Sequence, residues 1–158
     1  MRLDQKYKTL LNGYQINTPL RIAHFMAQLD HESGGFKYTK ELGNNAYFDK
    51  YEGRKDLGNT QKGDGARFKG MGFIQVTGRA NYTVLSKDTR IDFLNNPELL
   101  EQEANAMLSA CWFWSKKGLN TFADKDDFLT ITKRINGGTN GLEDRRRKLA
   151  KWKDLLSV

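Results

Sequence analysis

The sequence has little cysteine, little proline and no long apolar run. One cysteine, Cys111, and two prolines occur among its 158 residues. A lone cysteine excludes an internal disulfide framework and a cysteine-rich zinc module. No apolar run approaches the roughly 18 residues that a membrane-spanning helix requires, so we expect no integral membrane protein. The segment Met1–Lys6 has charges without an apolar stretch behind them, and we therefore expect no secretory signal peptide.

Positive charge, in contrast, is in excess. Lysine and arginine outnumber aspartate and glutamate by 26 to 19, which gives a net charge of +7. This balance predicts an anionic partner: nucleic acid, a membrane surface or an acidic polymer. Most of the excess lies within residues 133–153, where the only acidic side chains are Glu143 and Asp144. We therefore expect a basic C-terminal helix that binds an anionic polymer other than nucleic acid. A solvated helix face is the alternative for Arg145–Lys148.

Glycine is unevenly placed, because ten of the fifteen glycines fall between Gly34 and Gly78. Both prolines follow a good capping residue, in Thr18-Pro19 and Asn96-Pro97, which is typical of helix starts. Apolar spacing predicts five helices on the two sides of the glycine-rich middle. They cover about residues 3–11, 19–33, 97–117, 128–136 and 142–156.

Within the glycine-rich middle, Phe73–Thr77 is short, rich in β-branched residues and bounded by glycines, which predicts a strand or hairpin arm. The expected fold class is therefore α+β and predominantly α-helical. It has a small β-hairpin element and a long glycine-rich central segment. No linker interrupts the chain, so we expect a single catalytic domain over residues 1–158 without a separate wall-binding module. Irregular segments of this length are usually functional.

The sharpest local pattern is Leu29–Gly35, where Glu32 lies in the last turn of an apolar helix and two glycines follow. Core residues beside this carboxylate would penalise its charged form and keep it protonated near neutral pH. A protonated carboxylic acid is what a general acid needs to protonate a leaving oxygen. The alternative is a solvated glutamate, although a negative charge at a helix C-terminus opposes the helix dipole.

Two other patterns have weaker chemical interpretations. His24 and His31 are seven residues apart, but His31-Glu32 lacks the second histidine of a metalloprotease motif, so we expect no metal site. Gly70–Gly78 lacks the Lys-Ser/Thr ending of a phosphate loop, so nucleotide binding is not expected. On a strand, Gln75 and Thr77 would point the same way and could hydrogen-bond a sugar or hold a water. One polar face of an edge strand is the alternative.

Glycoside hydrolysis needs a second carboxyl group, and inverting enzymes hold the two far enough apart for a water. The acidic residues that follow Glu32 in the loop are the candidates for this group. They are Glu41, Asp49, Glu52, Asp56 and Asp64. Tyrosines in the same half of the chain are candidates to stack on sugar rings. They are Tyr47, Tyr51 and Tyr82.

Taken together, three segments resemble glycoside hydrolase family 19, the chitinase-like family that includes many bacteriophage endolysins. They are His31–Phe36, Gly63–Tyr82 and Ile135–Gly141, and their order matches the family. The resemblance covers roughly residues 18–156. It implies an inverting glycosidase of lysozyme-like architecture that needs no cofactor.

The resemblance also implies roles for single residues. Glu32 matches the general acid, and Thr77 stands where the family has the Ser or Thr that positions the attacking water. Gln75 and Asn81 match polar residues that line the sugar cleft. Asn136 matches the asparagine of a late Asn-Gly-Gly turn, and Arg145 more loosely matches a basic residue after that turn. With Tyr82, these four complete the expected substrate-binding set.

The catalytic base has two candidates. Lys40–Asn44 resembles a degraded form of the Glu-Asn-Leu block of endolysins, which favours Glu41. In plant-type chitinases the base lies further along the chain, closer to Glu52. The sequence also departs from the family at Met71, where an arginine is usual in a Gly-Arg-Gly. We favour Glu41 as the base and keep Glu52 as the alternative.

These features predict an endolysin that hydrolyses β-1,4-glycosidic bonds of bacterial peptidoglycan and causes host cell lysis. Such a monomer would be made in the host bacterial cytoplasm. It would act on the wall from the periplasm after a partner membrane protein has permeabilised the membrane. A chitinase acting on polymers of β-1,4-N-acetylglucosamine is the alternative with the same fold. A non-catalytic basic protein that binds the envelope or nucleic acid, and a zinc amidase, are alternatives of other classes.

Overall fold

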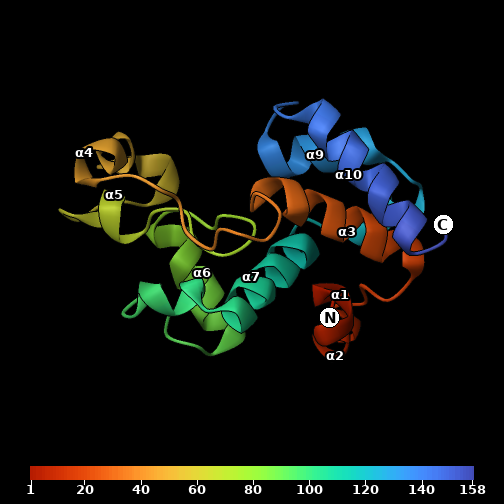
Figure 1. The fold of residues 1–158 in the computed structure, drawn as a ribbon. Helices are drawn as coiled ribbons and strands as arrows, with labels where there is room; N and C mark the ends of the chain where they lie inside the picture. The colour runs from red at the N-terminus through yellow and green to blue at the C-terminus, as the bar shows by residue number, and fades with distance from the viewer. The chain divides into compact units, whose positions relative to one another are not determined.

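The computed structural model describes all residues from Met1 to Val158 and is mostly helical. Its contacts divide the chain into two compact units (Figure 1). Unit 1 consists of residues 1–36 and 110–158, and unit 2 consists of residues 37–109. The predominance of helix confirms the expected fold class. The single catalytic domain over residues 1–158 stays a prediction.

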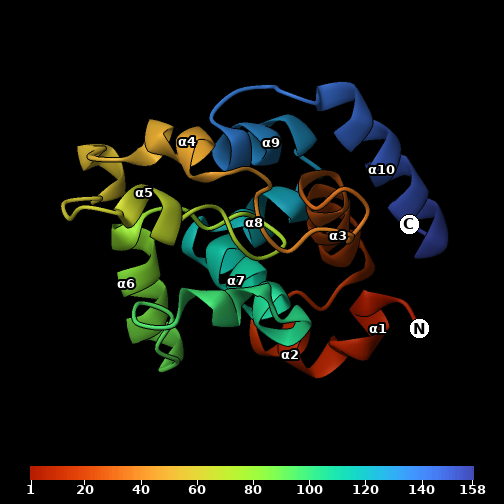
Figure 2. The ribbon, with the colours of Figure 1, turned by 60° about the vertical axis from the view of Figure 1, so that its left-hand side comes forward.

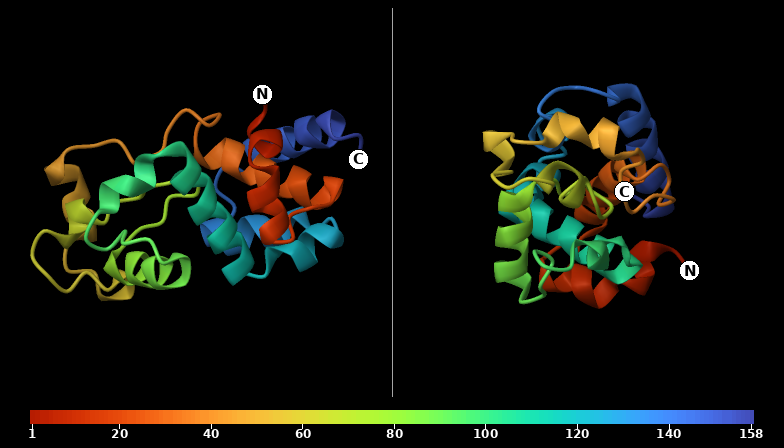
Figure 3. Two further views of the ribbon diagram at one scale, coloured as in Figure 1. Left: turned by 90° about the horizontal axis from the view of Figure 1, so that it is seen from below. Right: turned by 90° about the vertical axis from the view of Figure 1, so that its left-hand side faces the viewer.

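Unit 1 is built from helices alone and contains both chain termini (Figure 3). Its elements are α1 (Leu3–Lys6), α2 (Lys8–Gly13), α3 (Pro19–Glu32), the second half of α7 (Glu103–Lys116), α8 (Leu119–Asp124), α9 (Phe128–Asn136) and α10 (Leu142–Leu155). The helix expected over 3–11 is interrupted at Tyr7, which divides it into α1 and α2. The other helices expected in this unit are present.

Helix α3 forms the centre of unit 1. Thr18 caps it by accepting a hydrogen bond from the amide of Arg21 at 3.1 Å, and Pro19 occupies its first turn. All eight residues from Ala23 to Asp30 are buried. Helix α10 packs along α3, and α8 also contacts it (Figures 1 and 2). Burial of α3 on several sides fixes the position of the side chains at its C-terminal end.

Unit 2 contains short helices joined by long loops. Its elements are α4 (Asn45–Phe48), η1 (Asp49–Tyr51), η2 (Lys55–Leu57), α5 (Asp64–Arg67), α6 (Arg79–Thr89), η3 (Pro97–Glu101) and the first half of α7. Helix α6 follows the glycine-rich segment and was not expected from the sequence (Figure 2). Its apolar pattern is weak, because only Tyr82 and Leu85 are buried along it.

The strand expected at Phe73–Thr77 is wrong. The segment is a tight turn in which Met71 and Val76 form an isolated bridge, with N–O distances of 3.1 and 2.9 Å. The chain reverses at Gly72, whose φ is +82°, and at Gln75, whose φ is +64°. The apolar side chains of this turn are buried, so their β-branched character reflects packing in the core of unit 2. No helix of the protein combines the length and apolar composition that a bilayer span requires.

Candidate functional site

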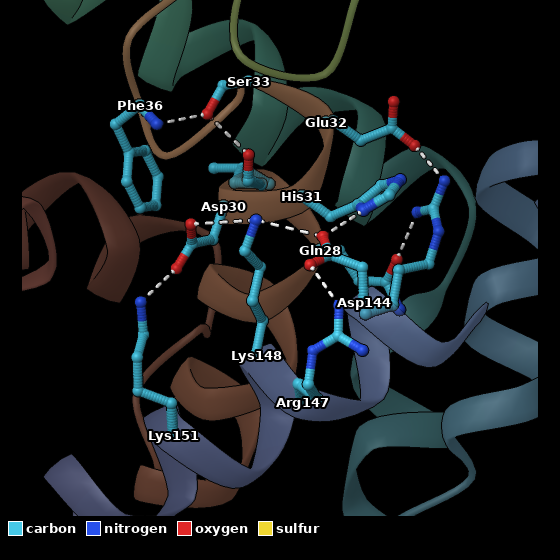
Figure 4. A network of polar contacts seen from close by, with 12 residues as sticks. Gln28, Asp30, His31, Glu32, Ser33, Phe36, Asp144, Arg147, Lys148 and Lys151 are labelled. Carbon is cyan, nitrogen blue, oxygen red and sulfur yellow. Dashed lines mark hydrogen bonds and ion pairs between the residues drawn. The ribbon is translucent and has the colours of Figure 1, made fainter. Parts of the chain in front are cut away.

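Glu32 is the last residue of α3, and its side chain is 20% exposed. Its Oε1 accepts a hydrogen bond of 2.5 Å from Nη2 of Arg145, a residue of α10 that is 1% exposed. Oε2 makes no hydrogen bond within the protein (Figure 4). The expected apolar surroundings of this carboxylate are therefore wrong. A buried cation that lies 113 positions away in the sequence faces it instead.

Two further contacts hold the guanidinium of Arg145. Nη1 donates to Oε1 of Gln28 at 2.6 Å, and Nε donates to the carbonyl of Asn140 at 3.0 Å. Gln28 is also buried, and its amide donates to the hydroxyl of Thr132 at 3.1 Å. Because Arg145 is sealed from solvent, it cannot touch a substrate, and its expected role in substrate binding is wrong. Its contacts make it a positioning residue for Glu32.

The basic side chains of α10 are mostly engaged within unit 1. Lys151 Nζ lies 2.7 Å from Oδ2 of Asp30, and Lys153 Nζ lies 2.7 Å from Oδ2 of Asp126. Arg146, with a side chain 56% exposed, has only a 3.9 Å contact with Glu143. The expectation of a wholly free basic face therefore needs correction. Most of these cations form ion pairs with aspartates of the same unit.

Lys148 joins the two acidic side chains nearest to Glu32 (Figure 4). Its Nζ lies 3.0 Å from Oδ2 of Asp144 and 3.6 Å from Oδ1 of Asp30, and Asp30 is 2% exposed. Asp144 Oδ2 also contacts Nδ1 of His31 at 2.6 Å. The hydrogen bond with His31, followed by that with Lys148, lowers the pKa of Asp144 to about 2. This network anchors the C-terminal end of α3 to α10.

Asn136 ends α9 in the Asn-Gly-Gly turn. Its Oδ1 accepts a hydrogen bond from the amide of Asn140 at 3.2 Å, and Gly137 follows with a φ of +79°. The turn thereby presents the carbonyl of Asn140 to Arg145. Asn136 is half-buried, and its expected contact with substrate stays a prediction.

Glu41 lies in unit 2, in the loop before α4, and its side chain is 18% exposed. Oε2 accepts hydrogen bonds from the hydroxyls of Tyr51 at 2.8 Å and Tyr47 at 3.3 Å. Oε1 accepts one from the amide of Gly70 at 3.2 Å. Lys50 Nζ lies 3.5 Å from Oε2. Burial raises the pKa of the Tyr51 hydroxyl, and its bond to Glu41 adds to the rise, so this donor keeps its proton at neutral pH.

The side chains of Glu41, Gln75 and Thr77 meet above Gly70. A Cβ added at Gly70 would lie 2.7 Å from Oε1 of Gln75 and 3.2 Å from both Oε1 of Glu41 and Oγ1 of Thr77. Only a position without a side chain lets these three oxygens pack so closely against the backbone. Thr77 donates its hydroxyl to the carbonyl of Gln75 at 3.0 Å, which fixes that oxygen. The structure therefore brings together three residues expected at the site, through a turn and not through a strand.

The two residues expected from the start of α6 have different positions. Asn81 is exposed, and its Nδ2 donates to the carbonyl of Thr77 at 2.8 Å, which leaves Oδ1 available. Tyr82 is fully buried and packs against Phe68 with ring centroids 5.0 Å apart. Its hydroxyl donates to the carbonyl of Lys69 at 2.6 Å. Tyr82 is therefore a core residue, and its expected stacking on a sugar ring is wrong.

Glu52, the alternative base, is exposed but already used by the backbone. Its Oε2 accepts from the amide of Gly63 at 2.8 Å, and its Oε1 accepts from that of Gly65 at 2.9 Å. These two hydrogen bonds lower the pKa of Glu52, so the carboxylate is a weaker proton acceptor. Glu52 holds a loop together, and the preference for Glu41 as the base stays a prediction.

Sequence reasoning missed the side chains that hold the two carboxylates. Gln28 could have been found, because it lies four residues before Glu32 and so shares its helix face. Tyr51 was noted only as a surface that could stack on sugars. Nothing local indicated that Gly70 would be the point where three side chains meet. No group of three or more His, Cys, Asp or Glu side chains in the protein is arranged to hold a metal ion.

Comparison of the sequence with known families and proteins gives consistent matches. A family model described as chitinase class I, of glycoside hydrolase family 19, matches residues 11–131. A glycosyl hydrolase family 19 domain-containing protein of Haemophilus influenzae is 32% identical, over 78% of this chain and 74% of its own length. An endochitinase of Arabidopsis thaliana is 30% identical over 74% of this chain, which spans only 39% of that protein.

Solved structures of similar fold point the same way. Chitinase C from Streptomyces griseus superposes with a TM-score of 0.72 at 25% identity, over 89% of this chain and 60% of that one. A bacterial family 19 chitinase superposes with a TM-score of 0.78, over 96% of this chain and 84% of that one. At 21% identity, the second likeness shows the fold alone.

Proposed function

Because the chain belongs to glycoside hydrolase family 19, we propose that it hydrolyses β-1,4-glycosidic bonds of bacterial peptidoglycan. One observation carries the proposal. The protein has two half-buried carboxylates, Glu32 held by an arginine and Glu41 held by tyrosine hydroxyls and a backbone amide. Two carboxyl groups with distinct surroundings are what general acid and general base catalysis of glycoside hydrolysis requires.

In this proposal Glu32 is the general acid. Arg145 holds Oε1, whereas Oε2 has no partner within the protein and is the atom that would carry the proton. In the reaction this proton passes to the glycosidic oxygen as its bond to the anomeric carbon breaks. The fixed position of Arg145 restricts the carboxyl to one orientation, which aligns the donor before the substrate binds.

Glu41 is the proposed base, and the attacking water is proposed to lie beside Oε1 of Glu41 and Oγ1 of Thr77, which converge on Gly70. Thr77 donates its own proton to the carbonyl of Gln75, so its oxygen is free to accept a hydrogen bond from the water. Glu41 accepts one proton of the water as the water oxygen bonds to the anomeric carbon. The other proton stays on the new hydroxyl group. Attack opposite to the leaving oxygen inverts the configuration at that carbon.

Peptidoglycan and chitin share the N-acetylglucosamine unit, and the endochitinases among the relatives favour chitin as the second candidate substrate. Peptidoglycan differs by the carboxylates of its stem peptides, which suit a chain of net charge +7. The proposal includes contact with anionic envelope polymers through exposed cations near the C-terminus that have no carboxylate within hydrogen-bond distance. These are Lys133, Arg134 and Arg146. As an endolysin, the protein would be a monomer that reaches the periplasm from the host cytoplasm after membrane permeabilisation.

The test is lysis of cells with a permeabilised outer membrane, followed by turbidity, beside release of sugars from colloidal chitin. We expect wall lysis, and mass spectrometry of the fragments should show a new reducing-end sugar. Chitin turnover without wall lysis would favour the chitinase.

Two controls address the other classes of function. Glu32→Gln should abolish lysis while the fold is kept, whereas Glu143→Gln, at an exposed carboxylate, should not change the rate. Unchanged lysis by Glu32→Gln would favour a non-catalytic basic protein. Loss of activity on chelation would favour a zinc amidase.

A further inference from the structure

Unit 2 has a cavity whose lining is polar and positively charged. Its volume is about 340 Å³, and it lies between α5, the start of α6 and the segment at residues 94–95. Three cations line it, Lys62, Arg67 and Arg79, against one carboxylate, that of Asp64. None of these residues has a part in the proposed reaction.

The single carboxylate of the cavity is already neutralised. Asp64 is 1% exposed and accepts from Nε and Nη2 of Arg79 at 2.8 and 2.9 Å, and from the amide of Gln61 at 3.1 Å. The hydrogen bond with Arg79 lowers the pKa of Asp64, so this pair stays ionised at neutral pH. Glu52, which lies near Lys62, is occupied by two backbone amides. Lys62 and Arg67 form no ion pair with a carboxylate, so the cations of the cavity outnumber its acidic groups.

Arg67 is held in place but keeps free donors. Its Nη2 donates to the carbonyls of Leu94 and Asn95, both at 3.2 Å, and its guanidinium lies 5.4 Å from the centre of the Phe68 ring. These contacts use one nitrogen, so Nε and Nη1 remain available. A guanidinium N–H group held in a fixed position is suited to donate a charged hydrogen bond to a carboxylate oxygen. Lys62 has no hydrogen bond or ion pair and adds a mobile charge.

We propose that this cavity binds a carboxylate of the peptide substituents on the glycan substrate. The inference rests on the proposed function, since chitin has no carboxylates and peptidoglycan has several on each stem peptide. Arg67 is three residues from Gly70, and Arg79 is two residues from Thr77, so the cavity belongs to the same segment as the proposed water site. The cavity would make the affinity for a charged wall polymer higher than that for a neutral glycan.

The test compares the wild-type protein with Lys62→Gln/Arg67→Gln on two soluble substrates. One is wall glycan with its stem peptides, and the other is the same glycan after an amidase has removed them. On the peptide-bearing glycan, KM should rise about tenfold with kcat unchanged, because a charged hydrogen bond contributes roughly that factor. On the peptide-free glycan, KM should stay the same. An equal rise on both substrates, or no rise, would overturn the proposal.

A matched control is Lys55→Gln/Lys87→Gln, which removes two exposed lysines of the same unit that form no ion pair. This control should leave both KM values unchanged, and a tenfold rise would assign the effect to net charge instead of the cavity. Binding of the free tripeptide L-Ala-γ-D-Glu-diaminopimelate, followed by NMR, tests the cavity without catalysis. Amide shifts should occur in residues 61–67 of the wild-type protein only. Their absence overturns the inference, whereas failure to cleave any wall glycan overturns only the proposed function.

Discussion

Glu32 and Glu41 have nearly the same exposure, 20% and 18%, but different donors. Glu32 is bound by a buried guanidinium that belongs to a network of charged and polar side chains in unit 1. Glu41 is bound in unit 2 by two tyrosine hydroxyls and one backbone amide, with a lysine at 3.5 Å. Exposure therefore does not distinguish the two carboxylates. Their hydrogen-bond donors distinguish them.

The difference matters because the two kinds of donor depend on their partners in different ways. A buried arginine left without its carboxylate is an uncompensated charge, which is strongly destabilising. A tyrosine hydroxyl that loses an acceptor at a half-exposed site can bind water instead. We therefore expect changes around Glu32 to affect stability and catalysis, and changes around Glu41 to affect catalysis alone.

The largest effect is expected from removal of either carboxylate. Glu32→Ala and Glu41→Ala should each lower kcat by about 10³-fold, a typical size for general acid–base catalysis. Azide should accelerate Glu41→Ala, because a small nucleophile that needs no base can occupy the water site, and should leave Glu32→Ala unchanged. The product with azide would be the α-glycosyl azide. If azide accelerated Glu32→Ala alone, Glu32 would be the base and Glu41 the acid.

The next effect is on stability. Arg145→Met leaves Glu32 and Gln28 without their buried donor, and should lower the free energy of unfolding by about 3 kcal/mol in urea titrations. The double variant Arg145→Met/Glu32→Gln should recover part of this loss, since a neutral amide at position 32 does not need a cation beside it. Tyr51→Phe, the matched change beside Glu41, should cost under about 1 kcal/mol. Equal losses for the two variants would contradict the comparison.

Gly70→Ala should then lower kcat with the fold intact. The added methyl group would lie within 3.2 Å of three oxygens and displace Glu41, Gln75 and Thr77 from their positions around the proposed water. We expect a decrease of about 30-fold in kcat, with a smaller change in KM, since a mispositioned reactant costs roughly one to two orders of magnitude. Gly53→Ala is a suitable control, because a Cβ there meets nothing within 4 Å, although its positive φ costs some stability. An unchanged kcat for Gly70→Ala would show that the attacking water does not lie beside these three oxygens.

A smaller effect is expected from Tyr51→Phe on catalysis. Loss of the 2.8 Å hydrogen bond frees Oε2 of Glu41 and should lower kcat about fivefold, because one such bond contributes on the order of 1 kcal/mol. Tyr38→Phe, at an exposed tyrosine, is the control. A similar decrease for both would show that the contact with Glu41 has no particular role.

The smallest expected effect is a pH dependence of the free energy of unfolding that originates in unit 1. Both histidines lie in unit 1, and burial lowers the pKa of His24, an effect that its bond with Asp126 only partly opposes. The unfolded chain binds a proton at about pH 6.5, where the folded protein does not. The contribution of His24 to the free energy of unfolding should therefore be fully present above that pH and fall as the pH is lowered through it. His24→Gln should abolish the fall, and a fall that persists would place its origin elsewhere.

Apolar spacing was enough to predict the long helices of unit 1, because burial on one face leaves a pattern with the period of a helix. It failed for Phe73–Thr77, since a buried turn and a buried strand contain the same apolar residues. It also missed α6, whose exposed surface is largely polar. Local composition describes burial, and the backbone path between buried residues depends on distant contacts.

The candidate site divides in the same way. The residues proposed to carry the chemistry, Glu32, Glu41 and Thr77, were predicted from the sequence, and their catalytic roles stay predictions. The surroundings of Glu32 were predicted wrongly because Arg145 comes from a distant helix. Tyr82 was assigned to a cleft because aromatic side chains suit sugars, but the same ring suits a core, and its hydroxyl found a backbone acceptor.

Unit 1 is interrupted in the sequence by all of unit 2, and this order has a consequence for synthesis. On the ribosome α3 emerges long before α10, since 113 positions separate Glu32 from Arg145. The buried face of α3 lacks its main partner until α10 has been translated. A nascent chain would thus hold its acidic residue in an unfinished environment, and activity would begin only when translation has passed α10.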